Sequence, residues 1–84
     1  KPSAAKRARQ AIKRRMRNRA YKSTLRNSLK QVTMAIEAGD KEAAQAALAR
    51  ACVRLDKTAS KGVIHRNVAA RSKSRLTRRV NRPG

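Results

Sequence analysis

Apolar side chains in the stretch before residue 40 recur three or four positions apart. They are Tyr21, Leu25, Leu29, Val32 and Ile36. This spacing places them on one face of an α-helix, so it predicts a helix that packs against a core. Residues 3–38 contain no glycine or proline. We therefore expect one helix from about Ser3, a candidate N-cap, to about Ala38, ended by Gly39.

The first half of this helix has a different character from the second. Only Ile12 and Met16 continue the apolar stripe there, and cationic side chains surround them. Such a helix has nothing in its own protein to pack on. We expect residues 1–19 to project as a basic helical arm, unfolded in the free protein, from a three-helix bundle formed by residues 20–81. The 84 residues then form a single domain.

Two further helices follow the same periodicity. Asp40 is a candidate N-cap for a helix over residues 41–59, whose inner face consists of Ala44, Leu48, Ala51 and Leu55. After a break at residues 60–62, a third helix is predicted over residues 63–81, with an inner face of Ile64, Val68, Ser72, Leu76 and Val80. No segment alternates with period two. The predicted fold class is all-α, a three-helix bundle with a long N-terminal helix that extends beyond it as the basic arm.

The charges are distributed unevenly along the chain. The net charge is +20, and all four acidic residues lie between Glu37 and Asp56. Residues 1–36 contain twelve Lys or Arg and no acid, so intrahelical ion pairs cannot form there. A cationic surface without internal compensation is typical of proteins that bind nucleic acids. With Tyr21 as the sole aromatic residue, recognition through base stacking is excluded, which leaves contacts to the backbone and to shape.

Other functional classes find little support in the sequence. His65 and Cys52 are the only residues of their kinds, too few for a zinc site, and no nucleophile–base pair or glycine-rich phosphate loop is present. We expect no catalysis, metal or cofactor. The lone Cys52 allows no internal disulfide, which indicates a reducing compartment. No apolar run is long enough to span a membrane. We expect no homo-oligomer.

Three alternatives share this composition. A DNA-condensing, nucleoid-type protein fits the charge nearly as well as an RNA-binding protein. A basic leucine zipper would need three or four heptads, but the apolar stripe stops at Gly39 after about two. A membrane-active cationic helix would need more bulky apolar residues than Ile12 and Met16 on the arm.

Specific motifs then favour one family. Residues 56–67 read DKTASKGVIHRN, residues 69–76 read AARSKSRL, and the arm contains SAAKRARQ and KRRMRN. These motifs resemble those of the twentieth protein of the bacterial small ribosomal subunit, and the resemblance extends over nearly the whole chain. The resemblance implies direct binding to small-subunit (16S-type) rRNA early in assembly, beside neighbouring ribosomal components. It also implies a location in the ribosome, in the bacterial cytoplasm or in a plastid stroma.

Carried over residue by residue, the resemblance gives two sets of RNA contacts. The first set follows the arm and the adjoining helix: Lys6, Arg7, Arg9, Lys13, Arg14, Arg15, Arg17, Asn18, Arg19, Lys22, Ser23 and Arg26. The second set begins before the third helix and follows it: Lys61, His65, Arg66, Asn67, Arg71, Lys73, Arg75, Arg78 and Arg79.

Overall fold

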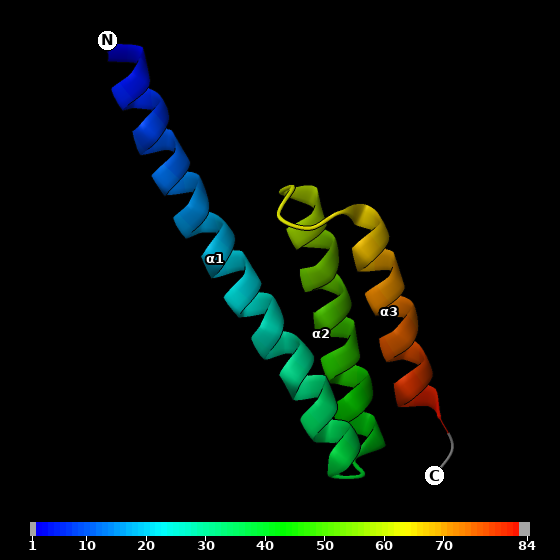
Figure 1. Ribbon diagram of the computed structural model, residues 1–84. Helices are drawn as coiled ribbons and strands as arrows, with labels where there is room; N and C mark the ends of the chain where they lie inside the picture. The colour runs from blue at the N-terminus through cyan, green and yellow to red at the C-terminus, as the bar shows by residue number, and fades with distance from the viewer. Residues whose placement is uncertain (1, 83–84) are drawn as a thin grey trace.

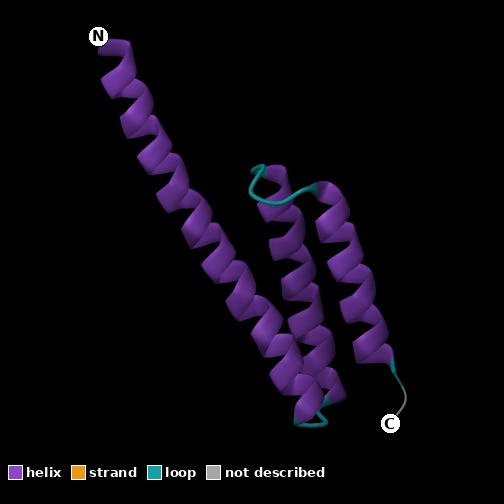
Figure 2. Cartoon of the chain, in the orientation of Figure 1, coloured by secondary structure: helices purple, strands orange, loops and turns teal. Residues whose placement is uncertain are grey.

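The computed structural model describes residues 2–82 and contains three helices (Figure 1). They are α1 (Pro2–Glu37), α2 (Lys41–Ser60) and α3 (Arg66–Asn81). Two short loops join them, and no strand occurs in the described part of the chain (Figure 2). The molecule is elongated, with extents of 62 × 22 × 13 Å. The prediction of an all-α, three-helix fold with a long first helix is confirmed.

The start of α1 differs from the predicted one, and its end agrees. The helix begins at Pro2, so Ser3 lies inside the first turn and is not the N-cap. The fixed φ of proline suits the first helical position, which explains why the helix starts there. At the other end Gly39 has φ +74°. The Gly39 N–H donates to the Ile36 carbonyl (3.1 Å) and the Asp40 N–H to the Ala35 carbonyl (3.2 Å), the Schellman pattern.

The helix α2 is capped at both ends by short-range interactions. The carboxylate of Asp40 accepts a hydrogen bond from the Ala43 N–H at 3.0 Å, which confirms Asp40 as the N-cap. Gly62, with φ +75°, ends the helix with a second Schellman pattern. There the Gly62 N–H donates to the Ala59 carbonyl at 2.9 Å and the Val63 N–H donates to the Thr58 carbonyl at 3.1 Å. Both turns therefore reverse the chain within a few residues.

The helix α3 begins three residues later than predicted. His65 is its N-cap, with extended backbone (φ −75°, ψ 145°), and its side chain accepts from the Asn67 N–H. The second Schellman turn occupies Gly62 and Val63, so the chain cannot resume a helix there. Histidine is outside the usual set of N-cap residues, which is why the prediction placed the start at Val63.

The core is small and rich in alanine. Its buried members come from all three helices: Leu25, Val32, Ala44, Ala47, Ala51, Leu55, Ala69, Leu76 and Val80. Val68 was predicted to face inward, but it is 45% exposed and Ala69 is buried in its place. A strict spacing of four residues drifts around a helix by about 40° per step, so five such positions cannot share one face. Ile64 precedes α3 and is half-buried against the core.

The three helices pack unequally on one another. The helix α2 contacts both neighbours along its length, whereas α1 and α3 barely touch. Ala44, Ala47 and Ala51 on α2 have short side chains, which let the neighbouring helices approach closely. The N-terminal part of α1 extends past α2 and α3 (Figure 1). Cys52, which follows the buried Ala51 on α2, is half-buried.

Candidate nucleic-acid interface

The arm presents its cations to solvent on every side. All side chains of residues 3–17 are exposed and so is that of Arg19, so every arm cation predicted to contact RNA faces solvent. Ile12 and Met16 are 55% and 67% exposed, so neither finds a partner within the described chain. The charge of this segment can therefore be neutralised only by another molecule.

A cationic stripe continues from the arm along one face of α1. Arg15, Arg19, Lys22 and Arg26 are spaced four, three and four residues apart, so they lie on the same side of the helix. With Asn18 and Ser23 they line a hollow of about 420 Å³. The stripe brings together half of the first predicted contact set on one surface.

Asn18 marks the point where α1 begins to pack. It is half-buried near the end of the arm, and the side chains of residues 3–17 before it are all exposed. Its Oδ1 is buried and has no hydrogen-bond partner among the described residues. Its position between Arg15 and Arg19 puts it at the junction of the arm and the bundle.

The second predicted set is largely exposed along α3 and the turn before it. Lys61, Asn67 and all five predicted arginines of α3 are exposed. Arg71, Arg75 and Arg79 recur four residues apart along the helix. Guanidinium groups suit phosphate binding because their planar forks can donate two parallel hydrogen bonds.

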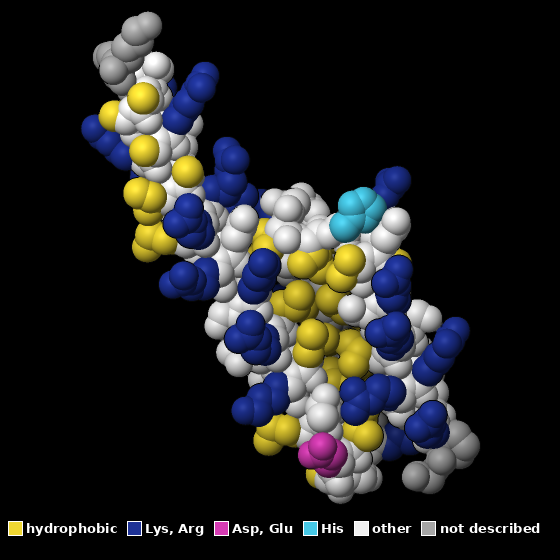
Figure 3. Space-filling model, viewed as in Figure 1, with side chains coloured by type: hydrophobic (Ala, Val, Ile, Leu, Met, Phe, Trp, Pro, Cys, Tyr) yellow, Lys and Arg dark blue, Asp and Glu magenta, His cyan; other side chains and the backbone are white. Residues whose placement is uncertain are grey.

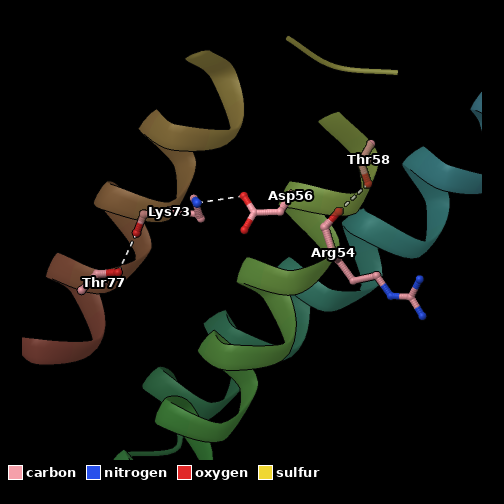
Figure 4. Close-up of polar contacts among 5 residues, drawn as sticks. All are labelled: Arg54, Asp56, Thr58, Lys73 and Thr77. Carbon is pink, nitrogen blue, oxygen red and sulfur yellow. Dashed lines mark hydrogen bonds and ion pairs between the residues drawn. The ribbon is translucent and has the colours of Figure 1, made fainter. Parts of the chain in front are cut away.

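Lys73 is arranged differently from the other predicted contacts. Its Nζ lies 2.8 Å from Asp56 Oδ1, so it forms an ion pair with α2 (Figure 4). The hydrogen bond with Asp56 raises the pKa of Lys73 above its ordinary value of 10.5. Part of its charge is thus already balanced within the protein, and its side chain is half-buried.

His65 combines the cap of α3 with an open donor. Its Nδ1 accepts the Asn67 N–H at 3.0 Å. In a neutral imidazole this places the proton on Nε2, which remains free to donate. The sequence indicated a polar surface contact for this residue, and the structure adds that its ring is oriented by the start of the helix.

One group of cations was missed by sequence reasoning. Arg50, Arg54 and Lys57 of α2 line a hollow of about 440 Å³ with polar residues of α1, among them Thr24 and Asn27. Arg50 and Arg54 lie in residues 37–56, whose net charge is only −1, and Lys57 directly follows that segment, so charge alone did not single them out. Their spacing of four and three residues is the signal that could have found them.

One face of the molecule separates charge from apolar surface. Lys and Arg side chains follow α1 on one side and α3 on the other, and apolar side chains lie between them (Figure 3). The acidic side chain visible on this face lies at the end of the bundle where α1 turns into α2. The arrangement can hold a polyanion along two cationic margins.

Within residues 2–82 no helix combines the length and the apolar character that a membrane span requires. The same residues contain no cluster of three His, Cys, Asp or Glu side chains suited to a metal ion. Neither observation adds a second kind of site to the cationic surfaces.

Comparisons with known proteins all identify the same family. The sequence matches the family described as Ribosomal protein S20 over residues 1–81. It is 59% identical over 78 residues to the small ribosomal subunit protein bS20 of Thioalkalivibrio sulfidiphilus, covering 93% of this chain and 91% of that protein. The bS20 of Trichlorobacter lovleyi is 56% identical over 82 residues (98% and 94%). That of Halalkalibacterium halodurans is 48% identical over 79 residues (94% and 87%).

Proposed function

Because the chain belongs to the ribosomal protein S20 family of the small ribosomal subunit, we propose that it binds small-subunit rRNA directly and supports the folding of that RNA during assembly. The observation that carries this proposal is the exposure of the arm and of the α3 arginines on an all-helical scaffold. Both surfaces present cations that no acidic side chain of the described chain balances.

The proposed mechanism is electrostatic. Phosphates of crowded RNA helices repel one another, and the arm supplies positive charge where a globular surface cannot reach. The contacts go to the backbone, so recognition depends on the shape of the folded RNA more than on base sequence. The arm set and the α3 set named above are the proposed contacts, with Lys73 contributing less because Asp56 already holds it.

The proposed setting follows from the family. A small-subunit protein works within the ribosome, beside rRNA and other ribosomal components. We propose that this chain works in a bacterial cytoplasm, with a plastid stroma as the alternative. We further propose that it acts as a single copy and not as a homo-oligomer.

The test is a binding experiment with the full chain. Affinity for a small-subunit rRNA fragment is compared with affinity for duplex DNA of equal charge, at two salt concentrations. We expect a preference for the rRNA that persists at the higher salt. The logarithm of the affinity should fall with the logarithm of the salt concentration with a slope of about 0.7–0.9 for each phosphate contact. Equal affinities that fall together would instead support a DNA-condensing protein.

A matched pair of variants sharpens this test. Arg15→Ala should weaken rRNA binding and reduce the salt slope by about 1, since one phosphate contact is removed. Lys30→Ala removes the same charge from an exposed position of α1 that belongs to neither contact set, and it should leave both quantities unchanged. Equal losses in the two variants would show that net charge, and not the cationic stripe, determines binding.

A further inference from the structure

A groove runs between α1 and α3 on the face shown in Figure 3. It exists because α1 and α3 each pack on α2 and barely touch one another. One part is a hollow of about 260 Å³ lined by Leu29, Thr33, Ser72, Arg75, Leu76 and Arg79. A second hollow, of about 320 Å³, also has Arg79 in its lining, together with Ile36, Val80, Asp40 and Lys41. We call these two neighbouring hollows the α1–α3 groove.

The floor of the groove and its α3 margin differ in chemical character. Its floor is apolar, with Leu29 half-buried and Leu76 only 7% exposed. Its α3 margin carries the guanidinium groups of Arg75 and Arg79, both exposed. A ligand that fits must therefore combine negative charge at its edges with carbon-rich surface between the charges.

Two hydroxyl groups also line the groove, and they differ in what they can still do. The Thr33 hydroxyl donates to the Leu29 carbonyl at 3.3 Å, so its proton is already used. Ser72 lines the same hollow and is half-buried. Within residues 2–82 its side chain makes no hydrogen bond, unlike that of Thr77 on the same helix, which donates to the Lys73 carbonyl. Ser72 therefore keeps both a donor and an acceptor for a ligand.

A sugar–phosphate backbone matches this arrangement. Its phosphates supply the negative edges, its ribose rings supply the carbon-rich surface, and its 2′-hydroxyls both donate and accept hydrogen bonds. A single strand would need aromatic side chains on which its bases stack, and the one aromatic residue, Tyr21, does not line the groove. A paired strand presents only its backbone, as a ridge, and requires no stacking.

Resting on the proposed function, we propose that the α1–α3 groove seats one backbone ridge of an RNA double helix, with Ser72 hydrogen-bonded to a ribose 2′-hydroxyl. Arg75 and Arg79 bind the flanking phosphates, and Leu29 and Leu76 contact the sugar. The groove thus distinguishes RNA from DNA at a position where the phosphates alone are alike.

The experiment uses the full chain and two duplexes of identical sequence. One is an RNA duplex taken from small-subunit rRNA, and the other carries 2′-fluoro groups, which keep the A-form geometry but remove the hydroxyls. Ser72→Ala is compared with the wild type and with Ser74→Ala, a matched control on the exposed side of the same helix. Circular dichroism melts establish that the variants fold alike.

We expect Ser72→Ala to weaken binding of the RNA duplex about 5-fold, the effect of one hydrogen bond, without changing binding of the 2′-fluoro duplex. Ser74→Ala should change neither. An unchanged RNA affinity for Ser72→Ala, or an equal loss on both duplexes, would overturn the groove proposal while leaving the proposed function intact. Failure of the wild type to bind the rRNA at all would overturn both.

Discussion

Lys73 Nζ and Asp56 Oδ1 lie 2.8 Å apart and form the one ion pair within residues 2–82. The pair joins α3 to α2 on the side of the bundle away from the α1–α3 groove, where no other charged contact links the two helices. Asp56 thus balances the charge of one cation of α3, and the other cations of α3 are available to bind an external partner. The pair helps to fix how α3 lies against α2.

The pH dependence of this pair is the first prediction. The pKa of Lys73 is raised in the folded state, so the stabilisation is complete below its ordinary value of 10.5 and is lost as the pH rises through the folded value. The difference in Tm between wild type and Lys73→Gln should therefore stay constant near neutral pH and shrink above 10.5. A Tm difference that grows with alkaline pH would contradict this.

Truncation of the core should affect stability sharply. Leu55 is 1% exposed and packs at the centre of the bundle, so Leu55→Ala should lower the free energy of unfolding by about 2–5 kcal/mol. Val53→Ala is the control, because Val53 lies on the same helix but is 62% exposed. Its effect should stay within about 0.5 kcal/mol in thermal or urea melts. Similar losses for both variants would disprove the assignment of the core.

The two turn glycines should respond alike to substitution. Gly39 and Gly62 have φ of +74° and +75°, and a Cβ at either position would meet no atom within 4 Å. The cost of Gly→Ala is then purely conformational, about 1–2 kcal/mol at each site. Gly→Asn should cost less, because asparagine tolerates this region better. Thermal melts of the four variants would test this. A site where Gly→Asn costs more stability than Gly→Ala would show that steric clashes, and not the φ angle, determine the loss there.

The cap of α3 gives a further stability prediction. Removing the acceptor by His65→Ala should destabilise the protein by about 1 kcal/mol, because the Asn67 N–H loses its partner. His65→Asn should restore most of the loss, since asparagine is among the strongest N-caps. If His65→Ala melts at the same temperature as the wild type, the cap contributes nothing measurable to stability.

The arm should be the least protected part of the helical structure. Residues 3–17 have no buried side chains to hold the helix, and their like charges oppose its formation. In the free protein we expect their amides to exchange with solvent far faster than those around Val32. Addition of the rRNA fragment should slow exchange in the arm. Protection of the arm equal to that at Val32 without RNA would contradict the prediction.

The parts of the fold that local chemistry determines were predictable. Asp40 and Gly39 lie where short-range rules place an N-cap and a helix end, and the stripe from Tyr21 to Ile36 is inward-facing. The start of α3 was missed because the preceding Schellman turn and the cap by His65 depend on geometry that composition does not carry. The burial of Ala69 in place of Val68 was missed because the prediction favoured the larger side chain over the helical angle.

The candidate site was predictable as a set of charges but not as surfaces. Exposure of the arm follows from its scarcity of bulky apolar residues, which are only Ile12 and Met16. The pairing of Lys73 with Asp56 can be predicted only if the alignment of α2 and α3 is known. Ser72 can be recognised as a candidate ligand contact only because the structure places it in the α1–α3 groove. Both are properties of tertiary packing between residues distant along the chain.

The order of the helices along the chain also has a consequence in time. Synthesis proceeds from the N-terminus, so the arm emerges before α2 and α3, and Leu25 and Val32 remain without partners until α2 has followed. Each helix then packs mainly on the next one in sequence, and such local contacts form rapidly. Until α2 appears, the α1 segment is an unneutralised polycation close to the RNA of the ribosome that makes it, and rapid formation of the α1–α2 hairpin shortens that interval.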